Sequence, residues 1–292
     1  MLEIKILRYF LALAKEESIT AAANNLHLTQ PTLSRQLMEL EQSLGTPLFI
    51  RGSRRITLTD EGIRLRKRAE EILELVHKTE SEFQSLSESV CGDIYIGCAE
   101  TDAMKLVVNV IKLMQDSYPQ IRIHIYSGNA NDVSERIDKG LLDFGVLIEP
   151  SHLTKYESLC LPQQDTWGVL MRKDCALANL KVISPSDLQA LPLIVSQQKY
   201  VSDSIEKWFK LNYEKLNITA TYNLIFNAAL MVEQNIGYAL CLDKLINTAG
   251  NTPLCFRPLY PKLQVDVNIV WKKHHVFSKA AELFLKQLKE HF

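Results

Sequence analysis

The chain has 292 residues, with 33 Lys and Arg against 34 Asp and Glu and a hydrophobic content of 47%. This balance is typical of a folded globular protein and excludes collagen-like and disordered chains. No apolar run reaches the roughly 18 residues of a membrane-spanning helix, and the first residues lack the basic start and cleavage site of a signal peptide. We therefore expect a cytoplasmic protein of about two domains.

Charge is distributed unevenly along the chain. The first 68 residues contain 11 basic and 7 acidic residues, so they carry +4 while the remainder carries −5. The basic residues cluster between Arg51 and Arg68. A basic front end on an acidic body suggests contact with a polyanion, although a solvated charged surface gives the same count.

The N-terminal region predicts three helices and a small hairpin. Apolar spacing places the helices at 5–17, 21–26 and 30–44, with Ser18 and Thr20 as cap candidates for the second. The third carries a proline in its first turn and ends at a glycine, as helices commonly do. The segment 50–58 alternates weakly around glycine and arginine, which is typical of a short hairpin.

The three helices have helix-turn-helix spacing, and the third begins with a polar face. An amide, hydroxyls and a guanidinium in the first turns suit the DNA major groove, because Gln pairs with an adenine edge and Arg with phosphate. The hairpin arginines are suited to the DNA backbone or the minor groove. The candidate DNA-binding residues are Thr29, Gln30, Pro31, Thr32, Ser34, Arg35, Arg51, Arg54 and Arg55. A helical bundle with an ordinary polar surface is the alternative.

A long helix is predicted from about Thr59-Asp60. Its apolar positions fall on a four-three seam, the period of a coiled coil. The seam consists of Leu65, Ala69, Ile72, Val76, Thr79, Phe83 and Leu86. We favour a helix that mediates self-association over an ordinary amphipathic helix packed on its own chain.

After Gly92, strands and helices alternate, which predicts an α/β body with mainly parallel sheets. The expected strands are 94–96, 121–126, 144–148, 167–171, 193–195, 218–222, 238–240 and 265–271. The expected helices are 103–117, 130–139, 202–211, 226–235 and 278–290, with Ser278 as the cap of the last.

Residues 18–37 (SITAAANNLHLTQPTLSRQL), followed by Leu44-Gly45-Thr46-Pro47-Leu48-Phe49 and Leu58-Thr59-Asp60-Glu61-Gly62, resemble the LysR-type transcriptional regulators of bacteria. Weaker matches at Gly92–Gly97 and Gly140–Gly145 extend the resemblance over the whole chain. The resemblance implies promoter binding that responds to a small molecule, with no cofactor and no membrane. It also implies a homodimer formed through the linker helix, and usually a homotetramer.

The same resemblance implies three domains. They are a winged helix-turn-helix at 1–58, a linker helix at 59–89, and an effector domain at 90–292 that resembles periplasmic binding proteins. The effector domain is expected to have two lobes, one of about 90–161 and 268–292 and the other of about 162–267.

In a two-lobed α/β domain a ligand lies at the carboxyl ends of strands, where helix N-termini converge. The residues that follow the predicted strands are therefore effector-binding candidates, and by resemblance they occupy the family's effector positions. They are Glu100, Thr101, Ser127, Gly128, Asn129, Ser196, Gln197 and Asn227, the last at the start of a helix. Plain helix capping or a turn explains any single one of them equally well.

Glu100 departs from the family, which often has a hydroxyl residue near this position. A carboxylate at a helix start already occupies the positive end of the dipole. We therefore expect a neutral, zwitterionic or amine-bearing effector rather than a simple carboxylate. Alternatively, Glu100 turns away and caps only its own helix.

Three other classes of protein are weighed against a ligand-responsive regulator. An enzyme is disfavoured because the sequence lacks a nucleophile elbow, a phosphate loop, GxGxxG and HExxH. A small-molecule-binding protein without a DNA-binding role is disfavoured by the Gln30, Ser34 and Arg35 face. The six cysteines form no CxxC pair and the histidines show no zinc spacing, so a metal site is disfavoured, while a thiol-based redox regulator of the same fold stays open.

Overall fold

The computed structural model describes residues 2–52, 55–84, 91–148, 153–210 and 215–292. Two of the residues singled out above, Arg54 and Leu86, lie outside these ranges. The chain divides into two compact units, Met1–Gln84 and Ser85–Phe292.

The first unit contains the helices and the hairpin expected from the sequence. Its elements are α1 (Ile4–Glu16), α2 (Ile19–Asn25), α3 (Gln30–Leu44), β1 (Phe49–Arg51), β2 (Ile56–Leu58) and α4 (Asp60–Gln84). Ser18 caps α2, because its hydroxyl accepts a hydrogen bond from the Ala21 N–H at 3.3 Å. Gly45 ends α3 in the left-handed conformation, with φ of 68°, which glycine adopts without a steric penalty.

The core of the first unit fixes the orientation of α3. Leu33, Leu37 and Leu40 are fully buried in a cluster that includes Phe10 of α1 and small residues of α2. At the start of α4, a Cβ on Gly62 would lie 2.0 Å from the Leu48 carbonyl oxygen, so only glycine allows this close approach. The hairpin of β1 and β2, called the wing below, and the long helix are therefore held against the three-helix core.

The long helix α4 has an apolar face with large exposed side chains. Ala69 is buried, whereas the seam residues Ile72 and Phe83 are exposed, Phe83 by 69%. Ile63 and Leu75 are exposed on the same helix.

The second unit alternates strands and helices. Its strands are β3 (Gly92–Cys98), β4 (Ile121–Ser127), β5 (Phe144–Ile148), β6 (Tyr156–Arg172), β7 (Leu193–Ser196), β8 (Ile218–Tyr222), β9 (Tyr238–Leu242), β10 (Leu254–Pro258) and β11 (Gln264–Lys272). Its helices are α5 (Met104–Ser117), α6 (Ala130–Asp138), α7 (Pro185–Leu188), α8 (Lys199–Phe209), α9 (Ile225–Glu233) and α10 (Lys279–His291), with short 3₁₀ turns at Leu153–Lys155 and Ala176–Asn179.

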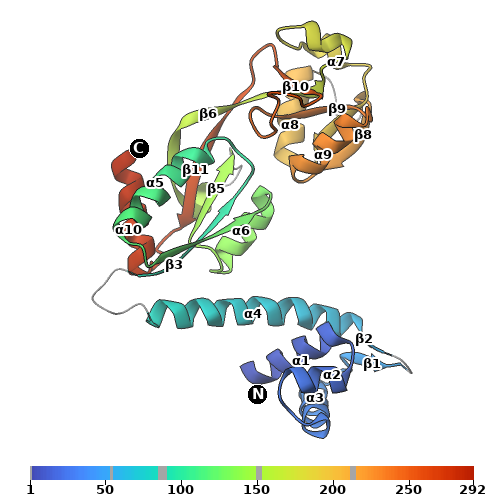
Figure 1. Ribbon diagram of the computed structural model, residues 1–292, viewed down its shortest axis with the longest axis vertical. Coiled ribbons are helices and arrows are strands. Elements are labelled where there is room, and N and C mark those ends of the chain that lie inside the picture. The colour runs from blue at the N-terminus through green and yellow to red at the C-terminus, as the bar shows by residue number, and fades with distance from the viewer. Residues whose placement is uncertain (1, 53–54, 85–90, 149–152, 211–214) are drawn as a thin grey trace. The chain divides into compact units, whose positions relative to one another are not determined.

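The strands form two lobes that share β6 and β11 (Figure 1). The order is β4-β3-β5-β11-β6-β9-β7-β8, with β10 paired to β6. The prediction of mainly parallel sheets is wrong. Although β3, β4 and β5 are parallel, as are β7, β8 and β9, the long strands β6 and β11 pair antiparallel to each other and to their other neighbours.

Helices cover both faces of each lobe. In the first lobe α5 and α10 lie side by side on one face, while α6 packs on the other with Val133 and Ile137 buried (Figure 1). In the second lobe α9 packs on β6 and β9. Ser278 caps α10 as predicted, because its hydroxyl accepts a hydrogen bond from the Ala281 N–H at 3.2 Å.

Some elements differ from the sequence expectations. β6 begins at Tyr156 rather than 167, and β10 and α7 were not expected. The first part of β6, residues 156–166, mixes exposed and buried positions, so it lacks the continuous apolar run that marks 167–171. Within the described ranges, no helix combines the length and the apolar character needed to cross a bilayer.

Candidate DNA-binding tip and effector cleft

The exposed start of α3 forms a polar tip, defined here as residues 29–35. Buried Leu33 anchors it, and Thr29 caps the helix by accepting the Thr32 N–H. The two threonine hydroxyls are 2.8 Å apart. The residues predicted for DNA contact that are exposed here are Thr29, Gln30, Pro31, Thr32 and Arg35, and Ser34 is half-buried.

The wing places an arginine beside this tip. The Arg51 Nη2 donates to Ser34 Oγ at 3.5 Å, which brings two predicted residues from separate elements together. Arg55 pairs with Glu17 at 3.5 Å, and Arg35 pairs with Glu39 at 3.4 Å. Because these ion pairs are exposed, each is worth little stability, and their guanidinium groups are available to phosphate.

Sequence reasoning missed one residue of the exposed α3 face. Met38 is 44% exposed, three residues after Arg35 and seven after Pro31. This spacing places the three on one helical stripe, opposite the buried leucines. An apolar side chain on that stripe is suited to the methyl group of thymine.

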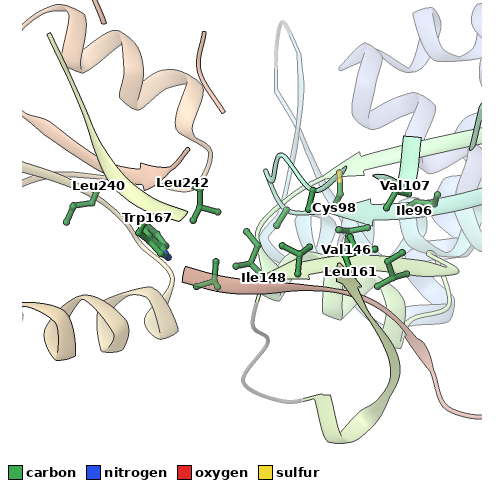
Figure 2. Packing of buried hydrophobic residues seen from close by; sticks show 14 of the residues in the cluster. Ile96, Cys98, Val107, Val146, Ile148, Leu161, Trp167, Leu240 and Leu242 are labelled. Carbon is green, nitrogen blue, oxygen red and sulfur yellow. The ribbon is translucent and has the colours of Figure 1, made fainter. Parts of the chain in front are cut away.

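A narrow cavity lies between the two lobes of the second unit, and the empty space between its walls is about 430 Å³ when the solvent at its mouth is included. The lining comes from strand ends and helix starts of both lobes. It consists of Ala99, Glu100, Gly128, Asn129, Ile148, Trp167, Ser196, Gln198, Tyr222, Asn223, Leu224, Ile225, Leu242 and Leu245. Figure 2 shows Trp167, Leu240 and Leu242 together on one side. On the other side, Ile148 is part of a second group of buried residues and lies on the side of that group that faces Trp167.

Half of the predicted effector residues line this cavity, namely Glu100, Gly128, Asn129 and Ser196. The other half do not. Ser127 is exposed at the end of β4, and Gln197 is exposed while its neighbour Gln198 faces the cavity. Asn227 does not begin its helix, because α9 starts at Ile225, and its side chain is exposed.

Glu100 makes a contact that the sequence did not predict. Its Oε2 accepts a hydrogen bond from the Ile225 N–H at 2.6 Å, so the carboxylate caps α9 of the other lobe rather than its own helix. Burial raises the pKa of Glu100, and the Ile225 N–H opposes that shift. The expectation that Glu100 caps only its own helix is wrong.

Thr101 has a structural role. It is buried, and its hydroxyl donates to Asp165 Oδ2 at 2.5 Å while accepting the Ala103 N–H at 3.0 Å. Burial raises the pKa of Asp165, and the Thr101 hydroxyl is the largest influence that lowers it. Thr101 also borders a shallower groove beside α5, where Asp102 forms ion pairs with Lys105 and Lys244.

The cysteines do not favour thiol-based sensing. All six carry free thiols. Burial raises the pKa of Cys98, and of Cys241 far more strongly. The pKa of exposed Cys160 is also raised, by desolvation and by the nearby Asp266 carboxylate. A thiol with a raised pKa is a weak nucleophile at neutral pH, so none of these three is activated for oxidation.

Several lining residues could not be identified from sequence. Trp167 and Leu242 lie within apolar strands and read as ordinary core. Tyr222 ends β8 and donates to the Leu240 carbonyl oxygen at 2.7 Å. Only Gln198 carried a usable signal, since it extends the polar run that begins at Ser196.

A winged helix-turn-helix followed by a two-lobed α/β unit with a cleft defines the class of DNA-binding regulators that respond to a ligand. Residues 4–63 match the family model of the bacterial regulatory helix-turn-helix protein, lysR family, and residues 87–292 match that of the LysR substrate binding domain. The chain therefore belongs to the LysR family of DNA-binding transcriptional regulators, which is not a family of enzymes.

Individual relatives agree with this assignment. The HTH-type transcriptional regulator BsdA of Bacillus subtilis is 36% identical over 220 residues, which cover 73% of this chain and 74% of BsdA. The HTH-type transcriptional regulator IlvY of Escherichia coli is 24% identical and covers 99% of this chain and 100% of IlvY. The structure is similar to full-length CbnR complexed with its target DNA, with a TM-score of 0.78, 18% identity and full coverage of both chains.

Proposed function

We propose that the chain regulates a promoter by placing the polar tip of α3 in the major groove and by binding a small molecule in the cleft between its lobes. The observation that carries this proposal is the exposed set of amide, hydroxyl and guanidinium groups on α3, fixed by three buried leucines of the same helix. The full-length likeness to CbnR, whose structure contains its target DNA, supports the same mode of binding.

Within this proposal the tip and the wing have different roles. Gln30 forms paired hydrogen bonds with an adenine edge, and Thr32 contacts a thymine methyl group. Arg35 and Arg51 bind phosphate oxygens. Phosphate contacts release counterions, so binding decreases steeply with salt concentration and is largely independent of sequence.

We further propose that the regulator is a homodimer through α4. The exposed apolar side chains Ile72, Leu75 and Phe83 support a helix that pairs with a second copy. A dimer presents two tips to successive turns of one duplex. We assign assembly into a tetramer to further exposed apolar side chains, Val108 and Leu113 on α5 and Phe226 and Leu230 on α9.

The DNA role is tested on the chain's own upstream promoter. We expect Gln30→Ala to cost about 1–3 kcal/mol on the footprinted site and to leave binding to random DNA unchanged. Gln42→Ala, an exposed glutamine about three turns later on α3, is the matched control and leaves both unchanged. Equal losses on specific and random DNA would contradict base readout by Gln30.

The dimer is tested by sedimentation of the full chain. Ile72→Glu places a charge on the apolar face and is expected to shift the protein toward monomers. The control Lys67→Glu alters charge at an exposed position of the same helix, on the side away from the seam. An unchanged mass for the Ile72→Glu variant would assign self-association to another surface.

A further inference from the structure

The cleft contains an acidic side chain that crosses from one lobe to the other. Glu100 follows β3, yet its Oε2 accepts the N–H of Ile225, the first residue of α9, at 2.6 Å. The N-terminus of this nine-residue helix carries partial positive charge, so it attracts an anion. In this structure the anion is supplied by the protein itself.

A second contact crosses the cleft in the opposite direction. The side-chain oxygen Oε1 of Gln198, which precedes α8, accepts the N–H of Ala130, the first residue of α6, at 3.1 Å. Each lobe therefore fills a helix N-terminus of the other, in one case with a carboxylate and in the other with a neutral amide oxygen.

The rest of the cavity lining is uncharged. Among the described lining residues, Glu100 is the one with a charged side chain, and no Lys or Arg joins it. Its Oε1 accepts no hydrogen bond from any described residue. Aromatic and aliphatic walls come from Trp167, Tyr222 and Leu242. The Trp167 Nε1 is also buried without a hydrogen-bond partner in the part of the chain that the structure describes.

We propose that Glu100 is an internal ligand that occupies the anion position at α9, and that the effector is an amine with an apolar body whose ammonium group pairs with the free oxygen of Glu100. The inference rests on the proposed function, because it requires the cleft to be the effector site. An incoming carboxylate meets a like charge at Glu100, and both helix N-termini are already filled. An ammonium group meets an unpaired carboxylate oxygen beside aromatic rings, which attract cations.

The electrostatics of Glu100 agree with this assignment. Burial raises its pKa even though a backbone N–H lowers it, as expected for a carboxylate without a cationic partner. A cation that binds beside it supplies that partner.

The experiment compares two probes of matched shape, 2-phenylethylamine and 3-phenylpropionate, by calorimetry on the full chain. We expect the wild-type protein to bind the amine at least about tenfold more tightly than the carboxylate. In Glu100→Ala this preference reverses, because the amine loses its partner and the free carboxylate takes the vacated position at α9. Glu282→Ala removes an exposed carboxylate from the first turn of α10 and serves as the matched control with wild-type behaviour.

Glu100→Gln provides a second variant in case the alanine variant unfolds. Its amide oxygen still accepts the Ile225 N–H, so the helix cap is kept while the charge is lost, and amine binding is expected to fall by about tenfold. The inference is overturned if the wild-type protein binds the carboxylate as tightly as the amine, or if it binds neither probe. It is also overturned if neither variant loses amine affinity.

Failure of the proposed function gives a different result. Ser196→Leu fills the cleft from the buried end of β7. Amine binding that is insensitive both to this change and to Glu100→Ala lies outside the cleft and contradicts the proposed effector site. Carboxylate binding that Ser196→Leu abolishes leaves that site intact and contradicts only the choice of an amine.

Discussion

The proposed DNA-binding tip and the proposed effector cleft are built in opposite ways. The tip is a contiguous stretch of seven residues at the start of one helix, supported by leucines of the same helix. The cleft is assembled from short segments that lie between Ala99 and Leu245 in sequence. A recognition surface made from one helix is therefore readable in local spacing, whereas a pocket made from strand ends depends on how two lobes close.

The largest effect is expected from removing the support beneath the tip. Leu37→Ala deletes most of a fully buried side chain and leaves a cavity, so we expect it to destabilise the first unit by about 2–5 kcal/mol. Urea unfolding followed with a probe in that unit measures the change. Met38→Ala, at the exposed neighbouring position, is expected to stay within about 0.5 kcal/mol. A small loss for Leu37→Ala would show that the tip does not depend on this core.

The next effect concerns the carboxylate buried beside the cleft. Thr101→Val removes the hydroxyl that donates to Asp165, and we expect a loss of about 1.5–3 kcal/mol at neutral pH. Burial raises the folded-state pKa of Asp165 above its unfolded value, so the charged form costs stability above that pKa. The difference between wild type and variant should therefore shrink as the pH falls through the raised pKa.

The control for this change is Thr219→Val, which removes a hydroxyl that donates to the neutral Leu193 carbonyl oxygen at 3.2 Å. Denaturation at several pH values should show a smaller loss with no comparable pH dependence. A Thr101→Val loss that stays constant with pH would assign the effect to packing rather than to the carboxylate.

These two sites show how far sequence reasoning extends. The exposed face of α3 followed from the leucine spacing and from a helix start marked by threonine and proline, although Met38 was missed. In the cleft, the rule that a ligand contacts residues just after strand ends selected four residues that line the cavity, Glu100, Gly128, Asn129 and Ser196. The same rule also selected Thr101, which is buried against Asp165. The sequence around a strand end does not reveal which of two neighbouring side chains, such as Glu100 and Thr101, faces the other lobe.

The prediction of the fold from the sequence was limited in the same way. The alternation of strands and helices predicted the α/β body, but not that β6 would extend from Tyr156 to Arg172 and serve both lobes. Its pairing with β11 joins residues about one hundred positions apart, and a register shift occurs between Asp266 and Asn268. Such long-range antiparallel pairing leaves no periodic signature in either strand.

A more modest effect is expected from the wing. Arg51→Ala removes a guanidinium group that lies beside Ser34 of the tip. We expect specific and random DNA to lose affinity equally, and the dependence of log K on log salt concentration to shrink by about one. Titrations at several salt concentrations measure this slope, with exposed Lys286→Ala of α10 as the control. A loss confined to the specific site would instead give Arg51 a role in base readout.

The smallest effect is expected from the ion pair between Glu17 and the wing, which should influence DNA affinity but hardly the stability of the first unit. Glu17 pairs with Arg55 of the wing at 3.5 Å, and both side chains are more than half exposed. Glu17→Gln is expected to change the free energy of unfolding by no more than about 0.5 kcal/mol, because exposed ion pairs contribute little. It removes a carboxylate that competes with phosphate for Arg55, so DNA binding at low salt should tighten slightly and that gain should vanish at high salt. The control Glu61→Gln, at the start of α4, changes the net charge by the same amount without removing this ion pair. An equal gain in DNA affinity from Glu61→Gln would show that the gain comes from net charge and not from the release of Arg55.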